Sequence, residues 1–254
     1  MSGCNITDFS AENLLRPPKA VGDEAEIEQL IAKTADSGYT LKYPKNGKFR
    51  SAIIMTDLDG NDSNEAVAFF RNSAETSSVH MLVMYSKDNS WEIASDNIFE
   101  TTDIDSVDFA DLTGNGKAEI IVNSTTYTPN VGKLSCYSYS EGKTNEVGSG
   151  QSCSSFVTGD FDNDGTSEIM SLVLYTTENE ALASMLDYNE DSKSLYAKAM
   201  ANMDPNVVKY KNIAATKLDN DITGIVVDGT SANEVTNTQV IFYSRDLAIL
   251  RNPL

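Results

Sequence analysis

Apolar and polar residues alternate in short runs along most of the chain, and a helical spacing is confined to one segment near its start. Between residues 23 and 37, acidic residues come first, a lysine comes late, and Ile27, Leu30 and Ile31 recur at three- and four-residue intervals. This spacing places the apolar residues on one face of an amphipathic helix. Gly38 suits the C-terminal end of such a helix. The pattern therefore predicts one helix over residues 23–37.

After residue 50 the chain shows strand-like runs and no helical period, which excludes a parallel α/β fold. The runs recur in groups of four, of which the last is the weakest, as in residues 91–94. The first three runs of the successive groups cover residues 52–56, 66–70 and 79–85; 106–110, 120–122 and 133–139; 154–159, 169–175 and 183–188; and 213–216, 225–227 and 239–243. Four antiparallel strands per repeat are typical of a β-propeller blade. The pattern predicts an all-β fold of four-stranded blades, preceded by a short helix.

An acidic stretch of nine residues separates the first run from the second in three of the groups. It reads DLDGNDSNE from Asp57, DLTGNGKAE from Asp111 and DFDNDGTSE from Asp160. Side chains with oxygen atoms occupy positions 1, 3, 5 and 9, and in the second and third stretches a glycine at position 6 allows a sharp turn. Hard cations such as Ca²⁺ take six to eight oxygen ligands. Each stretch therefore predicts a loop that can hold a cation.

The loops recur at a nearly constant interval. They start at residues 57, 111 and 160, and a decayed fourth copy starts at 217, so that the intervals are 54, 49 and 57 residues. A period near fifty residues indicates a repeat architecture. The fourth copy begins with Lys217, is one residue short and has no acid at position 9. We expect it to bind no metal, because Lys217 would place its own cation at the site.

These loops, each followed by a strand, resemble the calcium-binding blades of the FG-GAP and VCBS repeat family, which includes the integrin-α-type propellers. The resemblance covers residues 50–254 and rests on three matches in register. It implies Ca²⁺ ions held by the side chains at positions 1, 3, 5 and 9 and by the carbonyl at position 7. The implied ligands are Asp57, Asp59, Asn61, Ser63 and Glu65; Asp111, Thr113, Asn115, Lys117 and Glu119; and Asp160, Asp162, Asp164, Thr166 and Glu168.

Two loops depart from the family pattern. The first has Asp62 where glycine is expected, although aspartate tolerates a left-handed backbone better than most residues. The second has Thr113 at position 3 and so keeps two carboxylates. Because affinity follows ligand charge, we rank the third loop first, then the first, then the second. The ions would be structural, since they neutralise clustered carboxylates. The alternative is that the loops are acid-rich turns without metal.

The number of repeats leaves two architectures open. Propellers of this family usually close with seven blades, whereas four repeats are visible in this sequence. Either residues 22–254 form a four-bladed ring, in which residues 39–43 are the closing strand, or they form part of a larger propeller. We favour the larger propeller.

The first residues resemble the end of a bacterial lipoprotein signal, in which the cysteine is lipidated after cleavage. Ser2 and Gly3 precede Cys4, and residues 5–21 form a polar tether, but the charged and apolar parts of a signal peptide are missing. The resemblance implies a lipid anchor at Cys4 and an extracellular, cell-surface location. The alternative is an incidental cysteine near the start codon.

Composition narrows the function further. The net charge of −19 argues against nucleic acid and against electrostatic binding to membranes, since both need a basic surface. His80 is the only histidine and the chain has three cysteines, which do not support zinc sites or histidine-dependent triads. Cys136 and Cys153 are either a disulfide pair or two buried thiols.

No nucleophile elbow or phosphate loop is present, and the notable carboxylates belong to the cation loops. We therefore favour a non-enzymatic, calcium-stabilised and surface-anchored module that binds an unknown protein or glycan. Tyr127, Tyr137 and Tyr139 are candidate contacts, although tyrosines in strands more often serve packing. A propeller-fold carbohydrate-active enzyme, either a hydrolase or a lyase, and a purely structural module are the alternatives.

Overall fold

A computed structural model describes residues 22–36, 38–175, 180–204, 206–219 and 221–251. Residues 1–21, which include Cys4 and the tether, lie outside the described residues. The described part contains one helix, α2 (Asp23–Ala35), and seventeen strands. None of its helices has the length and apolar character needed to cross a membrane.

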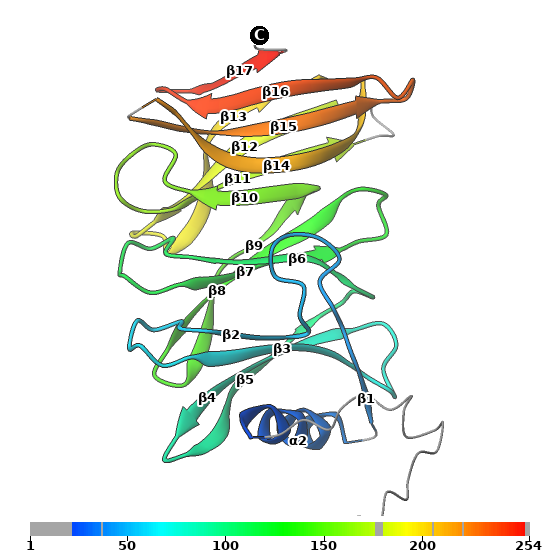
Figure 1. Cartoon of the computed structure of the whole chain (residues 1–254), viewed down its shortest axis with the longest axis vertical. Coiled ribbons are helices and arrows are strands. Elements are labelled where there is room, and N and C mark those ends of the chain that lie inside the picture. The colour runs from blue at the N-terminus through cyan, green and yellow to red at the C-terminus, as the bar shows by residue number, and fades with distance from the viewer. Residues whose placement is uncertain (1–21, 37, 176–179, 205, 220, 252–254) are drawn as a thin grey trace, which may run out of the picture.

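The strands form four antiparallel sheets (Figure 1), and the strands of the last three sheets follow the order of the chain. The first sheet contains β1 (Tyr39–Leu41), β2 (Ile53–Thr56), β3 (Glu65–Asn72), β4 (Val79–Lys87) and β5 (Ser90–Phe99). The second contains β6 (Ile104–Ala110), β7 (Glu119–Thr125), β8 (Gly132–Ser140) and β9 (Lys143–Cys153). The third contains β10 (Ser155–Gly159), β11 (Glu168–Tyr175), β12 (Glu180–Asn189) and β13 (Ser194–Asn202), and the fourth β14 (Val207–Asp219), β15 (Ile222–Ser231), β16 (Thr236–Tyr243) and β17 (Leu247–Arg251). The prediction of an all-β fold of repeated four-stranded units is confirmed.

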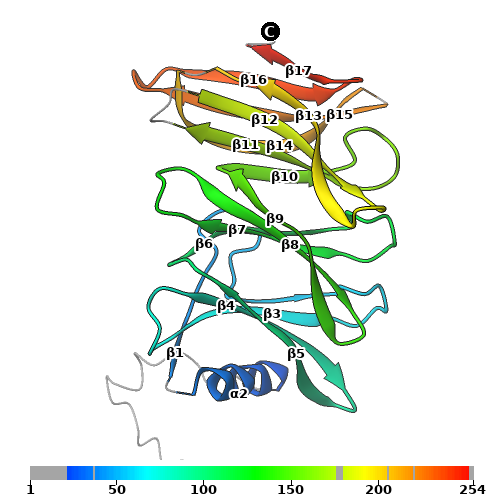
Figure 2. The same ribbon diagram turned by 180° about the vertical axis from the view of Figure 1, so that it is seen from behind.

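The four sheets stack in an open column and do not close into a ring (Figures 1 and 2). The first sheet lies beside α2 at one end, and the fourth lies at the other end. β1 pairs with residues 70–72 of β3, and β2 pairs with residues 65–68 of the same strand. The two short strands therefore share one edge of the first sheet. Residues 39–41 complete that sheet and form no link between the first and last sheets.

The apolar runs are buried because each sheet packs against the next one. Separate clusters of buried side chains lie between α2 and the first sheet, and then between each pair of neighbouring sheets. β3, β7 and β11 are buried on both faces, which explains why their sequences are apolar without strict alternation. Burial of one such large aliphatic side chain contributes roughly 1.5–3 kcal/mol.

Helix α2 covers the outer face of the first sheet. Ile27, Ile31 and Ala35 are buried against β3 and β5, in a cluster that includes Phe70 and Trp91. The helix ends two residues before the predicted position, since Asp36 already has a positive φ of 56°. The predicted amphipathic face is thus the face that closes the column at this end.

The segment between β1 and β2 leaves the first sheet and contacts the second. The backbone N–H groups of Lys45 and Asn46 donate to the carbonyls of Ile104 and Asp105, at 3.2 and 2.7 Å. The Lys45 ammonium lies 3.1 Å from Asp103. This segment therefore lies along the edge of β6 and ties the first two sheets together.

Cys136 and Cys153 are both buried and both unpaired. They lie in the same sheet, where Cys136 faces Gly148 and Cys153 faces Gly132 in the ladder between β8 and β9. The two thiols are thus separated along the strands. The structure therefore has two buried free thiols and no disulfide between Cys136 and Cys153.

Candidate metal loops

As the sequence predicted, each of the three acidic loops joins an edge strand of a sheet to the buried strand beside it. They connect β2 to β3, β6 to β7 and β10 to β11, and they lie on one side of the column, on the left in Figure 1. Each begins where an edge strand ends and finishes where a buried strand begins. The glutamate at position 9 is therefore the first residue of a buried strand.

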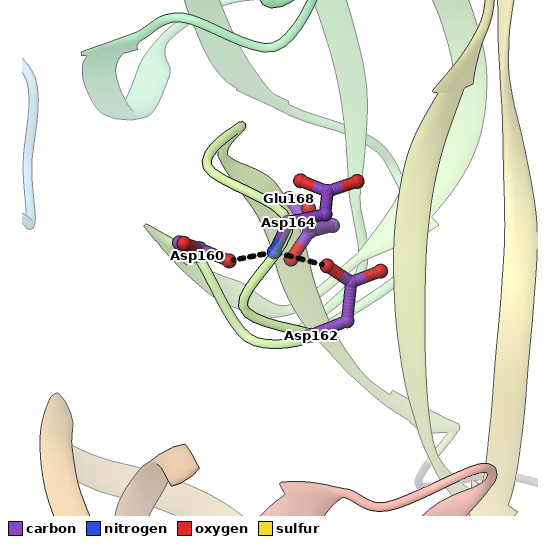
Figure 3. Close-up of side chains that lie close together, drawn as sticks. All are labelled: Asp160, Asp162, Asp164 and Glu168. Carbon is purple, nitrogen blue, oxygen red and sulfur yellow. Dashed lines mark hydrogen bonds between the residues drawn. The ribbon is translucent and has the colours of Figure 1, made fainter. Parts of the chain in front are cut away.

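The loops share one set of internal hydrogen bonds. In the third loop, the N–H of Asp164 donates to the Asp160 carboxylate at 3.1 Å (Figure 3). The N–H of Gly165 donates to the same carboxylate at 3.1 Å, and the N–H of Phe161 donates to Oε2 of Glu168 at 2.7 Å. The equivalent bonds to positions 1 and 9 of the other loops measure 2.8–3.3 Å. The carboxylates at positions 1 and 9 thus fix the loop backbone in all three copies.

Two positions of each loop have a left-handed backbone, of which only position 6 was predicted from the sequence. Position 6 has φ values of 65°, 80° and 94°, so Asp62 adopts the conformation that glycine has in the other loops. Position 4 has φ values of 74°, 71° and 63°, at Gly60, Gly114 and Asn163. Glycine and asparagine adopt this conformation most easily, so the residues at position 4 could have predicted this second left-handed position.

The third loop brings four carboxylates together. One oxygen from each of Asp160, Asp162, Asp164 and Glu168 lies within 4.8 Å of the others. Glu168 is fully buried, and its Oε1 has no hydrogen-bond partner. Burial, together with the charges of Asp162 and Asp164, raises the pKa of Glu168 to about 8. A buried carboxylate oxygen without a partner is costly, so this cluster fits a cation and can hold an ion such as calcium.

The first loop forms a similar group. Oxygen atoms of Asp57, Asp59 and Glu65 lie within 4.8 Å of one another, and Oδ1 of Asp59 is buried without a partner. Burial also raises the pKa of Glu65. The side-chain oxygen of Asn61 accepts the N–H of Ser63 at 2.7 Å. This loop can therefore also hold a metal ion.

The second loop satisfies its own carboxylates. The hydroxyl of Thr113 donates to Oε1 of Glu119 at 3.3 Å, and the N–H of Leu112 donates to Oε2 at 2.8 Å. Neither oxygen is without a partner. Asp111 and Glu119 are the only acids of this loop, so it has fewer carboxylates than the clusters of the first and third loops. Asn115 and Lys117 occupy positions 5 and 7. The carboxylates of this loop have hydrogen-bond partners without an ion.

The fourth repeat has lost the loop itself. Lys217 lies within β14 and faces Thr223 of β15, and Asp219 faces Ile222 at the end of the same ladder. The short copy in the sequence is thus a hairpin end. Lys217 fills no metal position, which corrects the expected reason for the missing site.

The three loops are also joined to one another. The N–H of Ala118 donates to the carbonyl of Leu58 at 3.1 Å, and the N–H of Ser167 donates to the carbonyl of Asp111 at 2.9 Å. The side chains at position 2 of the loops are buried in successive clusters between sheets. The loops are therefore linked to one another in a row along the column, and their position-2 side chains anchor them in the core.

A second polar feature lies along the first strands of the second, third and fourth sheets. It is an open groove with a volume of about 910 Å³, and the residues that line it include Lys45, Asp105, Asn123, Lys209 and Lys211. Thr126 and Thr128 line it as well, and Tyr127 between them is 96% exposed. The other two candidate tyrosines, Tyr137 and Tyr139, are buried between the first and second sheets.

Comparison of the sequence with protein-family models and with curated proteins gave no match. The resemblance to FG-GAP and VCBS repeats thus rests on the residues of the loops.

Proposed function

We propose that this chain is a calcium-stabilised, non-catalytic binding module made of propeller-type blades. The observation that carries the proposal is the third loop, in which four carboxylates converge and Oε1 of the fully buried Glu168 has no partner. All the donors are oxygen atoms, and a flexible shell of oxygens suits Ca²⁺ better than Mg²⁺, which demands octahedral geometry and keeps its waters.

The ions would serve the scaffold. Asp160, Asp162, Asp164 and Glu168 would hold one ion, and Asp57, Asp59, Asn61 and Glu65 would hold another, with the carbonyls of Ser63 and Thr166 adding an oxygen each. An ion in such a loop neutralises clustered carboxylates, and it binds the folded chain in preference to the unfolded chain. Because the loops are joined to each other and to the core between sheets, this stabilisation extends beyond the loops.

The propeller assignment is supported by the four-stranded meanders and by their face-to-face packing. Helix α2 occupies the face of the first sheet that a preceding blade would cover. This arrangement favours an open array with a cap at one end over a closed ring.

The groove is the surface that we propose for ligand binding. Within the described residues, neither Lys209 nor Lys211 forms an ion pair, and Tyr127 projects beside the groove, so the surface offers free cations and an aromatic ring. His80, by contrast, is buried, stacks on Phe70 and lies 2.9 Å from Asp96. A packed histidine of this kind supports a binding module over an enzyme. Anchoring through a lipid on Cys4 would place the module at the cell surface.

Isothermal titration calorimetry with CaCl₂ tests the calcium proposal. We expect one ion for the first loop and one for the third. Glu168→Gln should remove the third-loop ion and Asp57→Asn the first-loop ion, whereas Asp111→Asn should leave both. The absence of calcium binding by the unmodified protein would contradict the proposal.

A further inference from the structure

A lysine from another strand reaches into the third loop. The Nζ of Lys198, on β13, forms an ion pair with Oδ2 of Asp162 and a second one, at 2.8 Å, with Oδ2 of Asp187 on β12. The side chains are mostly shielded from water, with 24% of Lys198, 8% of Asp162 and 13% of Asp187 exposed. One of the four carboxylates of the third loop is thus already paired with a cation.

A β-bulge places this lysine. The pairing between β12 and β13 shifts so that Met185 faces Ala199 and Leu186 faces Ala197, which leaves Lys198 as the extra residue. A bulge redirects a side chain from its regular position in the sheet.

The bulge is repeated in the other sheets that carry a loop. The same shift leaves out Ala94 between β4 and β5 and Val147 between β8 and β9. The fourth sheet, which has no loop, has no shift between its last two strands. The bulge accompanies the loop, but Lys198 is the only one of the three bulge residues with a charge.

The Lys198 ammonium has other partners besides the loop. It pairs with Asp187, whose Oδ2 also accepts the hydroxyl of Tyr196 at 3.1 Å, and it lies 6.0 Å from the centre of the Tyr243 ring. These groups can stabilise a cation through ion pairing and a cation–π contact. Lys198 can therefore leave Asp162 without becoming an isolated buried charge.

We infer that Lys198 is a built-in competitor of the metal ion at the third loop, which it occupies through Asp162 when no ion is bound. This inference rests on the proposed function. Ca²⁺ that enters the loop must displace the ammonium from Asp162 toward Asp187 and Tyr243, or bind beside it against electrostatic repulsion. Both lower the affinity. The third loop is therefore a weaker site than its four acids alone would make it, and the first loop, with Ala94 at the bulge, lacks this restraint.

The test is calorimetric titration of CaCl₂ into the full chain carrying Asp57→Asn, so that the third loop is measured alone. In that background Lys198→Met should tighten calcium binding by roughly tenfold, because it removes a unit charge a few ångströms from the ion. Lys198→Arg keeps the charge and should bind as weakly as the parent. Lys133→Met, which removes an exposed charge on β8 far from the loop, should leave the affinity unchanged.

A second readout protects the test against a folding defect. Thermal unfolding of the Lys198→Met variant should begin from a lower melting temperature without calcium, since two ion pairs are lost, and should rise more than the parent on calcium addition. If the parent binds calcium at this loop and Lys198→Met does not bind it more tightly, the inference about Lys198 is overturned and the proposed function stands. If neither protein binds calcium at this loop, the proposed function is overturned with it.

Discussion

At the scale of single residues, Glu168 is the clearest sign that the third loop suits a cation. One of its oxygens accepts a backbone N–H, and the other is buried with no partner. In Glu119 the corresponding oxygen receives the Thr113 hydroxyl. A single side chain at position 3 thus separates a loop that is complete by itself from one that fits an ion.

Replacement of this carboxylate should separate stability from calcium response. Glu168→Gln keeps an acceptor for the N–H of Phe161 but removes a buried charge. We expect the metal-free variant to be more stable than the parent at pH 8 by about 1–3 kcal/mol, and to gain less from calcium. Urea unfolding with a chelator measures the first effect. A metal-free variant that is less stable than the parent would show that the charge is not a cost.

The raised pKa values predict an unusual pH dependence. Burial raises the pKa of Glu168 to about 8 and that of Glu119 to about 7, both above their usual value of 4.5. A group whose pKa is higher in the folded state stabilises that state fully below the unfolded pKa and loses this effect as pH rises through the folded pKa. The chelator-treated protein should therefore lose stability between pH 4.5 and pH 8. Calcium needs the ionised carboxylate, so the calcium-induced rise in melting temperature should be larger at pH 8 than at pH 6. A rise of equal size at both values would contradict this.

At the scale of elements, the joined loops predict coupling between repeats. A Cβ at Gly114 would lie 2.7 Å from Cγ2 of Thr166 in the third loop, whereas a Cβ at Gly116 would meet nothing within 4 Å. Both glycines have positive φ, so alanine carries a similar backbone strain at either position. Gly114→Ala should therefore weaken calcium binding at the third loop, although it lies in the second, and Gly116→Ala should not. Calorimetry on the two variants compares them directly; equal affinities would mean that the loops act separately.

The elements themselves followed largely from local sequence, and their long-range contacts did not. The strands on either side of the loops were predicted because alternation and turn residues are local signals, and α2 was predicted from its apolar spacing. The division of the first sheet's edge strand between β1 and β2, with residues 45–49 lying against β6, depends on contacts between distant segments. Lys198 was missed for the same reason, because a bulge is set by pairing and a lysine in a weak strand has no distinctive pattern.

At the scale of the whole molecule, the column has a metal-loop side and a separate groove. The proposed role of the groove in ligand binding can be tested separately from calcium binding. Tyr127→Ala and the double change Lys209→Glu and Lys211→Glu should each abolish capture of glycans or cell-wall material in an array or pull-down, with little change in melting temperature, because these side chains are exposed. Lys143→Glu, which changes an exposed lysine on β9 that does not line the groove, is the matched control and should keep binding. Binding that survives both groove changes would place the ligand elsewhere.

The measurement that tests the central claim most directly is a thermal melt of the unmodified protein at pH 8, with excess calcium and with a chelator. A ligand at about 100 times its dissociation constant stabilises the folded state by about 2.7 kcal/mol, which for a chain of this size is roughly 5–10 °C. We predict a rise in this range with Ca²⁺ and a smaller rise with Mg²⁺. An identical melting temperature with calcium and with chelator would contradict the claim that these loops hold calcium.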